Sequence, residues 1–286
     1  TFLLPMPVDT AEVTVQLYDF KHRVMTSLRH EVVPSDILIR NLDSHPVAPH
    51  RYLHRSGTPA EKIDVAIVAE GYTAEQADSF YADAQKAVDA LLQHEPFNRY
   101  ADRFNFVAVA LPSADTDVSI PQEGKWRNTA LGSNFSTFYS DRYLTTLNQF
   151  SLHNQLAGIP YEHIIILANT YTYTYGGGGI YNAYTLTTTH HADFRPVVVH
   201  EFGHSFAGLA DEYYYDDQYE NYYASDVEPW EQNLTTLKHF DQKWQDMLPP
   251  RTAIPTPPDA RHMDRIGVYE GGGYMSKGVY RAYQDC

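Results

Sequence analysis

His200-Glu201-Phe202-Gly203-His204-Ser205-Phe206-Ala207-Gly208-Leu209-Ala210-Asp211-Glu212-Tyr213 is the stretch from which the rest of the chain is best interpreted. Two histidines four positions apart on a helix point the same way, because four residues make slightly more than one turn. The imidazoles of His200 and His204 can therefore bind one Zn²⁺ together. Glu201 lies beside the first ligand and can take a proton from a water molecule at the metal's open position, where the metal lowers the pKa of that water. The spacing thus indicates a zinc hydrolase.

The surrounding residues favour a metal helix over a surface helix that carries two histidines by chance. Residues 196–199, Pro-Val-Val-Val, are typical of a helix that opens with proline in its first turn and buries an apolar face. Gly208 favours the end of that helix and a sharp turn, which can return an acidic side chain to the metal. Asp211 and Glu212 are the two candidates for this third ligand.

The stretch also resembles the signature of the bacterial IgA-peptidase family of zinc metallopeptidases, which is related to the metzincins. Residues 63–72, 177–182 and 278–281 are similar to that family as well, so the resemblance covers about residues 60–286. It implies a metzincin-like catalytic domain, with a twisted, mostly parallel sheet backed by helices and the active-site helix below. The chain departs from the wider pattern H-E-x-x-H-x-x-G-x-x-H, since the glycine and the third ligand each fall one residue later and the ligand is acidic. We predict Asp211 as this third ligand, and Glu212 is the alternative.

Hydrophobic periodicity predicts an α/β fold in the same region. Apolar runs predict strands over residues 63–69, 104–111 and 163–168, and helices are expected over about 73–93 and 136–157. Strands that alternate with helices form a mostly parallel sheet between helical layers.

The first part of the chain has a different pattern. Val13, Val15 and Leu17 alternate with polar residues as in a half-buried strand, and residues 36–40 are a second strand candidate. Prolines and glycine between residues 46 and 59 mark a linker. We therefore expect part of a small β domain over residues 1–58 and the zinc metallopeptidase catalytic domain over residues 59–286.

The segment before the metal helix is a candidate for substrate binding. Tyrosines alternate over residues 171–175, which predicts a strand, and four glycines follow from Gly176. No Lys-Ser/Thr pair follows these glycines, so a phosphate-binding loop is disfavoured. We predict an edge strand over residues 179–186 that holds an extended peptide through main-chain groups, as metzincin-type peptidases do. Its predicted substrate-binding residues are Gly179, Ile180, Tyr181 and Asn182; a plain sheet strand is the alternative.

The C-terminal part offers two further candidates. Metzincins place a methionine-containing turn under the zinc, and Met275 or a methionine beyond Cys286 can fill this role. A tyrosine hydroxyl can stabilise the oxyanion of the reaction, and we predict Tyr280 for it, with Tyr274 and Tyr283 as alternatives. A tyrosine packed into the fold is the commoner outcome.

Composition limits the partners. The formal net charge of −15 argues against nucleic acid and anionic membranes, since phosphate groups are bound by clustered Lys and Arg. No apolar run approaches the ~18 residues of a membrane span. The single cysteine, Cys286, excludes an internal disulfide framework. We expect a secreted, periplasmic or cell-surface protein, although no signal sequence opens the chain.

The sequence therefore predicts a zinc-dependent endopeptidase that acts on protein or peptide substrates; it does not predict the oligomeric state. Two alternatives remain. The same residues can hydrolyse another amide bond, and the 23 Tyr and 13 Phe also suit a non-catalytic module that binds protein or glycan. Glu201 argues against the second alternative, because a binding module has no use for a catalytic base.

Overall fold

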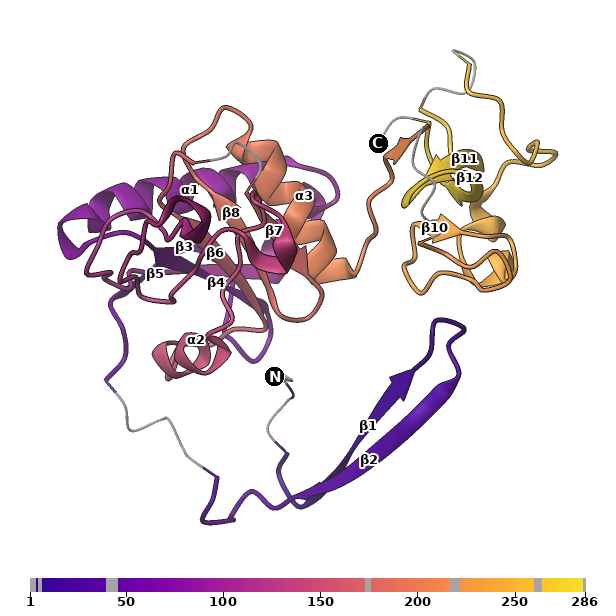
Figure 1. Ribbon diagram of the computed structural model, residues 1–286. Coiled ribbons are helices and arrows are strands. Elements are labelled where there is room, and N and C mark those ends of the chain that lie inside the picture. Colours follow the sequence, from indigo (N-terminus) through magenta and orange to yellow (C-terminus); the bar gives the residue numbers. More distant parts are fainter. Residues whose placement is uncertain are drawn as a thin grey trace. The chain divides into compact units, whose positions relative to one another are not determined.

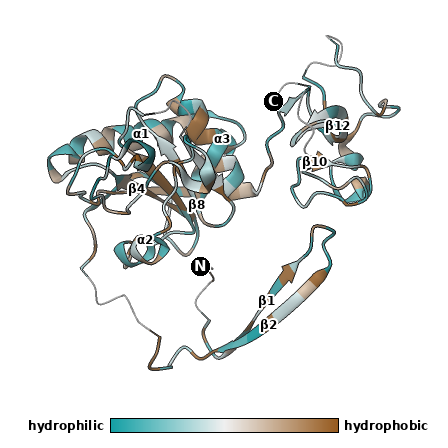
Figure 2. Cartoon of the chain, in the orientation of Figure 1, coloured by the Kyte–Doolittle hydropathy of each residue, from teal (hydrophilic) through white to brown (hydrophobic). Residues whose placement is uncertain are grey.

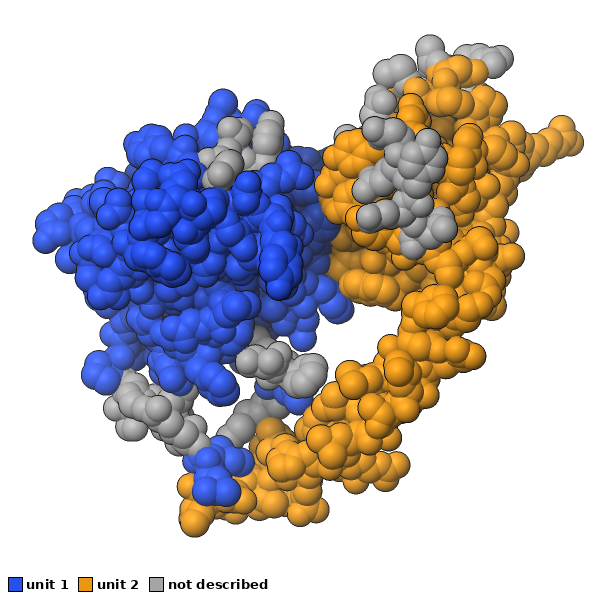
Figure 3. Space-filling view, in the orientation of Figure 1, with its two compact units in different colours: residues 1–4, 38–207 blue, residues 5–37, 208–286 orange. Residues whose placement is uncertain are grey.

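The computed structural model describes residues 4, 7–39, 46–172, 176–216, 222–259 and 264–284. The chain forms two compact units, shown in Figures 1 and 3. Unit 1 comprises residues 1–4 and 38–207, and unit 2 comprises residues 5–37 and 208–286. Residues 1–58, which we expected to form part of one β domain, are thus divided between the two units.

A six-stranded mixed sheet forms the centre of unit 1, with the strand order β3-β5-β4-β6-β8-β7 (Figure 1). The four inner strands are parallel to one another, and the edge strands β3 and β7 are antiparallel to their neighbours. The strands are β3 His50–Arg55, β4 Ile63–Glu70, β5 Phe104–Val109, β6 His163–Ala168, β7 Gly177–Ile180 and β8 Tyr184–Thr188. The predicted α/β class with a mostly parallel sheet is confirmed, whereas the metzincin-like details stay a prediction. The sheet also includes β3, which precedes residue 59.

Both faces of this sheet are covered, which explains why the inner strands β4, β5 and β6 are mostly apolar. On one face, side chains such as Val65 and Ile165 pack against α1 (Ala77–Gln93) and α3 (Phe194–Ala207). On the other face, Ala66 and Ile166 pack against α2 (Gln149–Gln155) and the long loops before it. Figure 2 shows these strands as a hydrophobic band inside the unit. Short 3-10 turns complete the unit: η1 Ala74–Gln76, η2 Phe97–Arg103, η3 Pro121–Glu123 and η4 Thr137–Tyr139.

The boundaries of several predicted elements are confirmed. The strand over residues 163–168 coincides with β6, and the helix expected over 73–93 ends with α1 at Gln93. Its start is the predicted capping box, formed by Thr73 and Gln76.

Two predicted elements are wrong. The helix expected over residues 136–157 is confined to α2, because Ser136 and Phe138 have left-handed backbones (φ +64° and +54°) that a helix cannot include. The side chain of Asn148 then begins the helix by accepting a hydrogen bond from Ser151 N at 3.4 Å. The strand expected over residues 36–40 is also wrong, since residues 37–39 form turns; Arg40 lies outside the described residues.

Unit 2 is built from small sheets. β1 (Ala11–Tyr18) and β2 (Val24–Val32) form an antiparallel hairpin, which confirms the strand predicted from the alternation at Val13–Leu17. A second sheet has the order β10-β12-β11, and β9 pairs parallel with β12. Its elements are β9 Tyr214–Tyr215, β10 Leu234–Thr235, β11 Tyr269–Gly272 and β12 Tyr274–Arg281, with η5 Phe240–Gln242 and η6 Gln245–Met247. A small apolar cluster around Phe240, Trp244 and Val268 forms its core.

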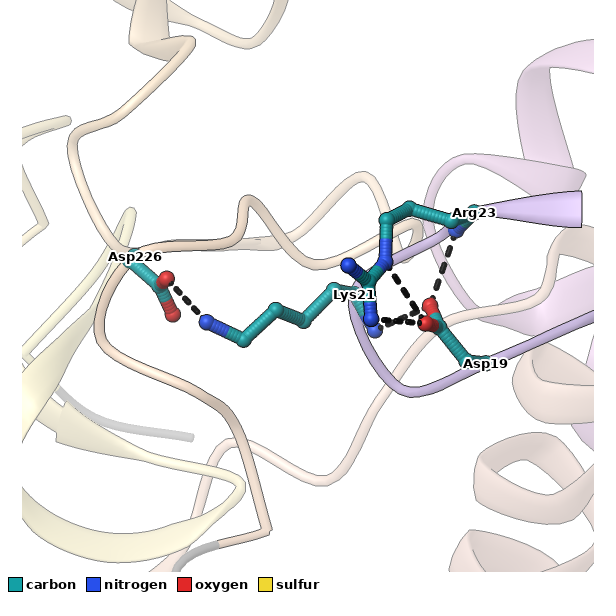
Figure 4. A network of polar contacts seen from close by, with 4 residues as sticks. All are labelled: Asp19, Lys21, Arg23 and Asp226. Carbon is teal, nitrogen blue, oxygen red and sulfur yellow. Dashed lines mark hydrogen bonds and ion pairs between the residues drawn. The ribbon is translucent and has the colours of Figure 1, made fainter.

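Polar contacts at the tip of the β1–β2 hairpin connect it to the rest of unit 2 (Figure 4). Asp19 accepts hydrogen bonds from the backbone N–H groups of Lys21 and Arg23, both at 2.9 Å, and these close the turn. The bond from the Arg23 backbone is the main cause that lowers the pKa of Asp19. Lys21 Nζ then reaches Asp226 Oδ2 at 2.5 Å, so an ion pair joins the tip to the segment that follows residue 221. None of the helices within the described ranges combines the length and the apolar character that crossing a membrane requires.

Candidate metal and catalytic site

Helix α3 carries the H-E-x-x-H residues, and both of its ends are as predicted. Pro196 lies in the first turn, and Gly208 follows the last helical residue with a left-handed backbone, φ +63°. The helix buries Phe194, Val198 and Phe202 in the core of unit 1. These residues recur every four positions, so they hold one face of the helix against the sheet and leave another face available for chemistry.

The other face brings His200, Glu201 and His204 together, with one ligand atom of each lying within 4.8 Å of the others. The Nε2 atoms of the two histidines are 3.1 Å apart, and the ring planes are nearly perpendicular at 88°. Two ligands bound at ~2.05 Å to one ion with tetrahedral geometry are separated by roughly 3.3 Å. His200 is exposed and the other two are half-buried, so solvent and ligands can reach the group. These donors therefore fit Zn²⁺.

The metal helix is fastened to β8 and to the turn before it by hydrogen bonds. Thr185 Oγ1 donates to the backbone carbonyl of Glu201 at 3.2 Å and shares a 2.6 Å hydrogen bond with Ser205 Oγ. The backbone N–H of Asn182 donates to Ser205 O at 3.1 Å. Thr185 and Ser205 are both buried. The position of Glu201 along the sheet is thus fixed by polar side chains inside the fold.

The edge strand β7 lies directly against the metal helix. A Cβ atom added to Gly179 would be 2.0 Å from the carbonyl oxygen of Glu201 and 2.7 Å from Cβ of His204. Only glycine allows so close an approach between a strand and a helix. The edge of the sheet therefore runs beside the two residues that carry the predicted base and the second metal ligand.

The single edge strand predicted over residues 179–186 is wrong. β7 ends at Ile180, residues 181–183 form a turn, and β8 begins at Tyr184, so the stretch is a hairpin. The turn closes through a hydrogen bond from Ala183 N to Ile180 O at 2.9 Å. Gly179 and Ile180 lie in the edge strand, Tyr181 and Asn182 in the turn, and their role in substrate binding stays a prediction. The tyrosine strand expected over residues 171–175 lies partly outside the described residues, since 173–175 are not described.

The two acidic candidates for a third ligand belong to unit 2 and have different surroundings there. Glu212 Oε1 accepts a hydrogen bond from Asn233 Nδ2 at 3.0 Å, and burial raises the pKa of the Glu212 carboxyl group. Asn233 also exchanges two hydrogen bonds with the backbone of Ala210, at 2.9 and 2.8 Å. Glu212 is therefore part of a structural anchor. The Asp211 carboxylate instead accepts a hydrogen bond from the hydroxyl of Tyr274. Asp211 as the metal ligand stays a prediction.

The tyrosine and methionine candidates are spread over β12 and its end. Tyr280 packs against the Phe240 cluster of unit 2, and burial raises the pKa of its hydroxyl. Tyr283 is exposed, and Tyr274 contacts Asp211. Met275 pairs with Tyr215 of β9, while Cys286 lies outside the described residues. The roles predicted for Tyr280 and Met275 are untested.

The sequence prediction missed the supporting contacts of Thr185, Ser205 and Asn233, and it considered Tyr274 only as an oxyanion donor and not as a partner of Asp211. One signal was present for the first of them: Thr185 and Thr187 interrupt the buried segment 184–188, and buried hydroxyl groups need partners. Asn233 carries no comparable signal, because its partners are more than twenty positions away.

Comparison with known proteins identifies the chain. The profile of the family described as IgA Peptidase M64 matches residues 52–265, a range that includes α3 and Asp211. The chain belongs to the IgA peptidase M64 family. It is therefore a peptidase, and hence a hydrolase, as the resemblance in the sequence implied. A search of curated proteins found no match.

Proposed function

We propose that this M64 peptidase is a zinc-dependent endopeptidase that cleaves peptide bonds within protein substrates. The observation that carries the proposal is the convergence of the His200 and His204 Nε2 atoms, 3.1 Å apart, on the helix that also bears Glu201. His200, His204 and, from unit 2, Asp211 would hold the ion. When bound, Zn²⁺ polarises the scissile carbonyl and acidifies the attacking water.

Glu201 supplies the acid–base chemistry in this proposal. Its carboxylate takes a proton from the attacking water and then delivers it to the leaving amine. Two features support this role. Its ligand atom lies within 4.8 Å of the histidine nitrogens, and the hydrogen bond from Thr185 fixes its backbone. A base whose main chain is held in this way needs little reorganisation when substrate binds.

The edge strand β7 is the element on which we propose that substrate binds. Within the described residues β7 pairs only with β8, so its other edge offers main-chain groups for an extended peptide, and Gly179 brings that strand into contact with the residues of the metal helix. Ile180 and Tyr181 are 42% and 56% exposed, which leaves them accessible to substrate side chains. A polymer that pairs with the strand would have its main chain near the zinc.

Replacement of Glu201 by glutamine tests the proposal. Glutamine keeps the size of the side chain but cannot accept the proton, so we expect cleavage of unfolded casein to fall by at least ~10²-fold. Binding of zinc, measured by competition with a chromogenic chelator, should change little. Glu61→Gln is the matched control, because it removes the same charge from an exposed residue of unit 1.

Near wild-type cleavage by Glu201→Gln would contradict the proposed role of the base. Comparison of short and long peptides addresses the alternative substrate class: an amidase for small compounds would cleave both at similar rates, whereas pairing along β7 favours the longer ones.

A further inference from the structure

We propose that Tyr274 is a positioning residue, which fixes the carboxylate of Asp211 in the orientation needed to bind the metal. The inference rests on the proposed function, in which Asp211 is the third ligand. It adds the group that orients this ligand, on an element 63 positions away in sequence.

The contact itself is a hydrogen bond from the hydroxyl of Tyr274 to Oδ2 of Asp211. An isolated carboxylate rotates about its bond to Cβ. A hydrogen bond to one oxygen stops this rotation and so sets the direction of the lone pairs on the other oxygen. Outer residues that orient metal ligands in this way strengthen metal binding, because less freedom is lost when the ion arrives.

The backbone holds the two residues in register. Gly273 N donates to the carbonyl of Asp211 at 2.8 Å, and Tyr274 N donates to that of Tyr213 at 3.0 Å. The turn between β11 and β12 is therefore attached to the segment that carries Asp211. The side chain of Tyr274 therefore reaches Asp211 across two segments that are already hydrogen-bonded to each other.

Tyr274 adopts an unfavourable backbone conformation to make this contact. Its φ is +67°, in the left-handed region that residues with a side chain rarely enter. Such conformations persist where surrounding contacts enforce them, and they concentrate at functional sites. Gly273 before it cannot be replaced without a clash, because an added Cβ would lie 2.3 Å from the ring of Tyr223. The turn is thus built to place one particular side chain.

The ring of Tyr274 is also held between two other tyrosines. The ring centroid of Tyr274 lies 5.3 Å from that of Tyr213, in an edge-on arrangement, and 5.0 Å from that of Tyr222, in a tilted arrangement. These contacts limit the rotation of the ring, so the hydroxyl stays directed at Asp211. Phenylalanine would retain the same ring packing and lose only the hydroxyl.

The test is the affinity for zinc alone, measured on the full chain by chelator competition, for wild type, Tyr274→Phe, Asp211→Ala and the double variant. We expect Tyr274→Phe to weaken binding by about 10- to 100-fold. In the Asp211→Ala background, Tyr274→Phe should cause no further loss, since its only route to the metal is through that carboxylate. Tyr269→Phe, on the paired strand β11, is the matched control: its hydroxyl donates to Arg265 O, and the variant should bind zinc like wild type.

The outcomes separate the inference from the function on which it rests. Unchanged affinity in Tyr274→Phe, with weaker binding in Asp211→Ala, overturns the positioning role alone. Unchanged affinity in Asp211→Ala overturns the assignment of the third ligand and the inference with it. Equal losses of zinc affinity in Tyr274→Phe and Tyr269→Phe, or a full further loss in the double variant, indicate a general weakening of unit 2 and overturn the inference.

Discussion

Helix α3 of unit 1 and the Asp211 segment of unit 2 carry the proposed metal ligands on supports of different kinds. The three residues on α3 lie within five positions, and the helical repeat alone brings them together. Asp211 itself accepts hydrogen bonds from Gly273 N and from the hydroxyl of Tyr274, and Asn233 holds its neighbours Ala210 and Glu212. Local helical geometry brings the residues on α3 together, whereas long-range contacts hold Asp211.

The supports also differ in physical character. α3 is held by close packing, with Phe194, Val198 and Phe202 in the core and the backbone of β7 against it, and in addition by the buried hydroxyl groups of Thr185 and Ser205. The Asp211 segment contains only the two-residue strand β9 and is held by polar groups such as Asn233. Added volume should therefore damage the first support most, and removal of a polar group should damage the second.

Replacement of Gly179 by alanine should have the largest effect. The added methyl group would lie 2.0 Å from the carbonyl oxygen of Glu201, so β7 and α3 must separate. We expect a loss of stability of about 3 kcal/mol or more, at the upper end of the range for overpacking. Thermal unfolding and zinc affinity measure the effect, and both should fall.

Gly178→Ala is the matched control for this variant. Gly178 is the preceding residue of the same strand, but its added Cβ would meet only the ring of Tyr143, at 3.8 Å. We expect near wild-type stability and zinc affinity. If the two alanine variants behave alike, α3 does not depend on close contact with β7, and the proposed contrast with the polar support of Asp211 is lost.

Replacement of Asn233 by alanine should have an intermediate effect, confined to unit 2. It removes the hydrogen-bond partner of both backbone groups of Ala210 and of the Glu212 carboxylate. Partly buried polar groups left without partners cost about 1–3 kcal/mol. Hydrogen exchange read by mass spectrometry should accelerate in peptides that cover residues 209–213 and stay unchanged in α3.

Gln232→Ala is the control, because Gln232 is exposed and its side chain donates to the carbonyl of Trp230, outside the residues that Asn233 holds. Faster exchange in α3 as well as in residues 209–213 would show that the two supports are not independent.

This contrast also explains how much of the site could be predicted from the sequence. The metal helix, the proline in its first turn and its end before Gly208 follow from rules that involve neighbouring residues only. The buried strands β4, β5 and β6 follow in the same way from continuous apolar runs. In each case the information lies within one segment of the chain.

Long-range contacts could not be predicted in this way. The hairpin of β7 and β8 resembles a single strand in sequence, because no Asn-Gly or Asp-Gly marks its turn, and Asn182 takes the left-handed position at φ +52°. The pairing of Tyr274 with Asp211 joins residues far apart in sequence, and many tyrosines nearby were equal candidates. Only the folded backbone selects among them.

The smallest change in stability that we expect comes from the carboxyl group of Glu162 in unit 1. It tests whether polar groups stabilise unit 1 less than they stabilise the Asp211 segment of unit 2. Glu162 Oε2 accepts a hydrogen bond from Asp64 N at 2.6 Å; burial, the main cause, and the nearby Asp64 carboxylate raise the pKa of Glu162 above its ordinary value of 4.5. The folded state thus binds this proton more tightly than the unfolded state does. Stability from this group is present below pH 4.5 and is lost as pH rises through the folded pKa.

Glu162→Gln keeps an oxygen for the Asp64 N–H and removes the charge, so the variant should be slightly more stable than wild type at pH 7. This advantage should shrink towards pH 4, where wild-type Glu162 is protonated. Urea unfolding at pH 4, 5.5 and 7 measures the difference, with Glu61→Gln to account for the loss of one negative charge from a chain of net charge −15. A loss of stability at pH 7 would mean that the charged form of Glu162 supports β4, and that unit 1 also depends on polar anchors.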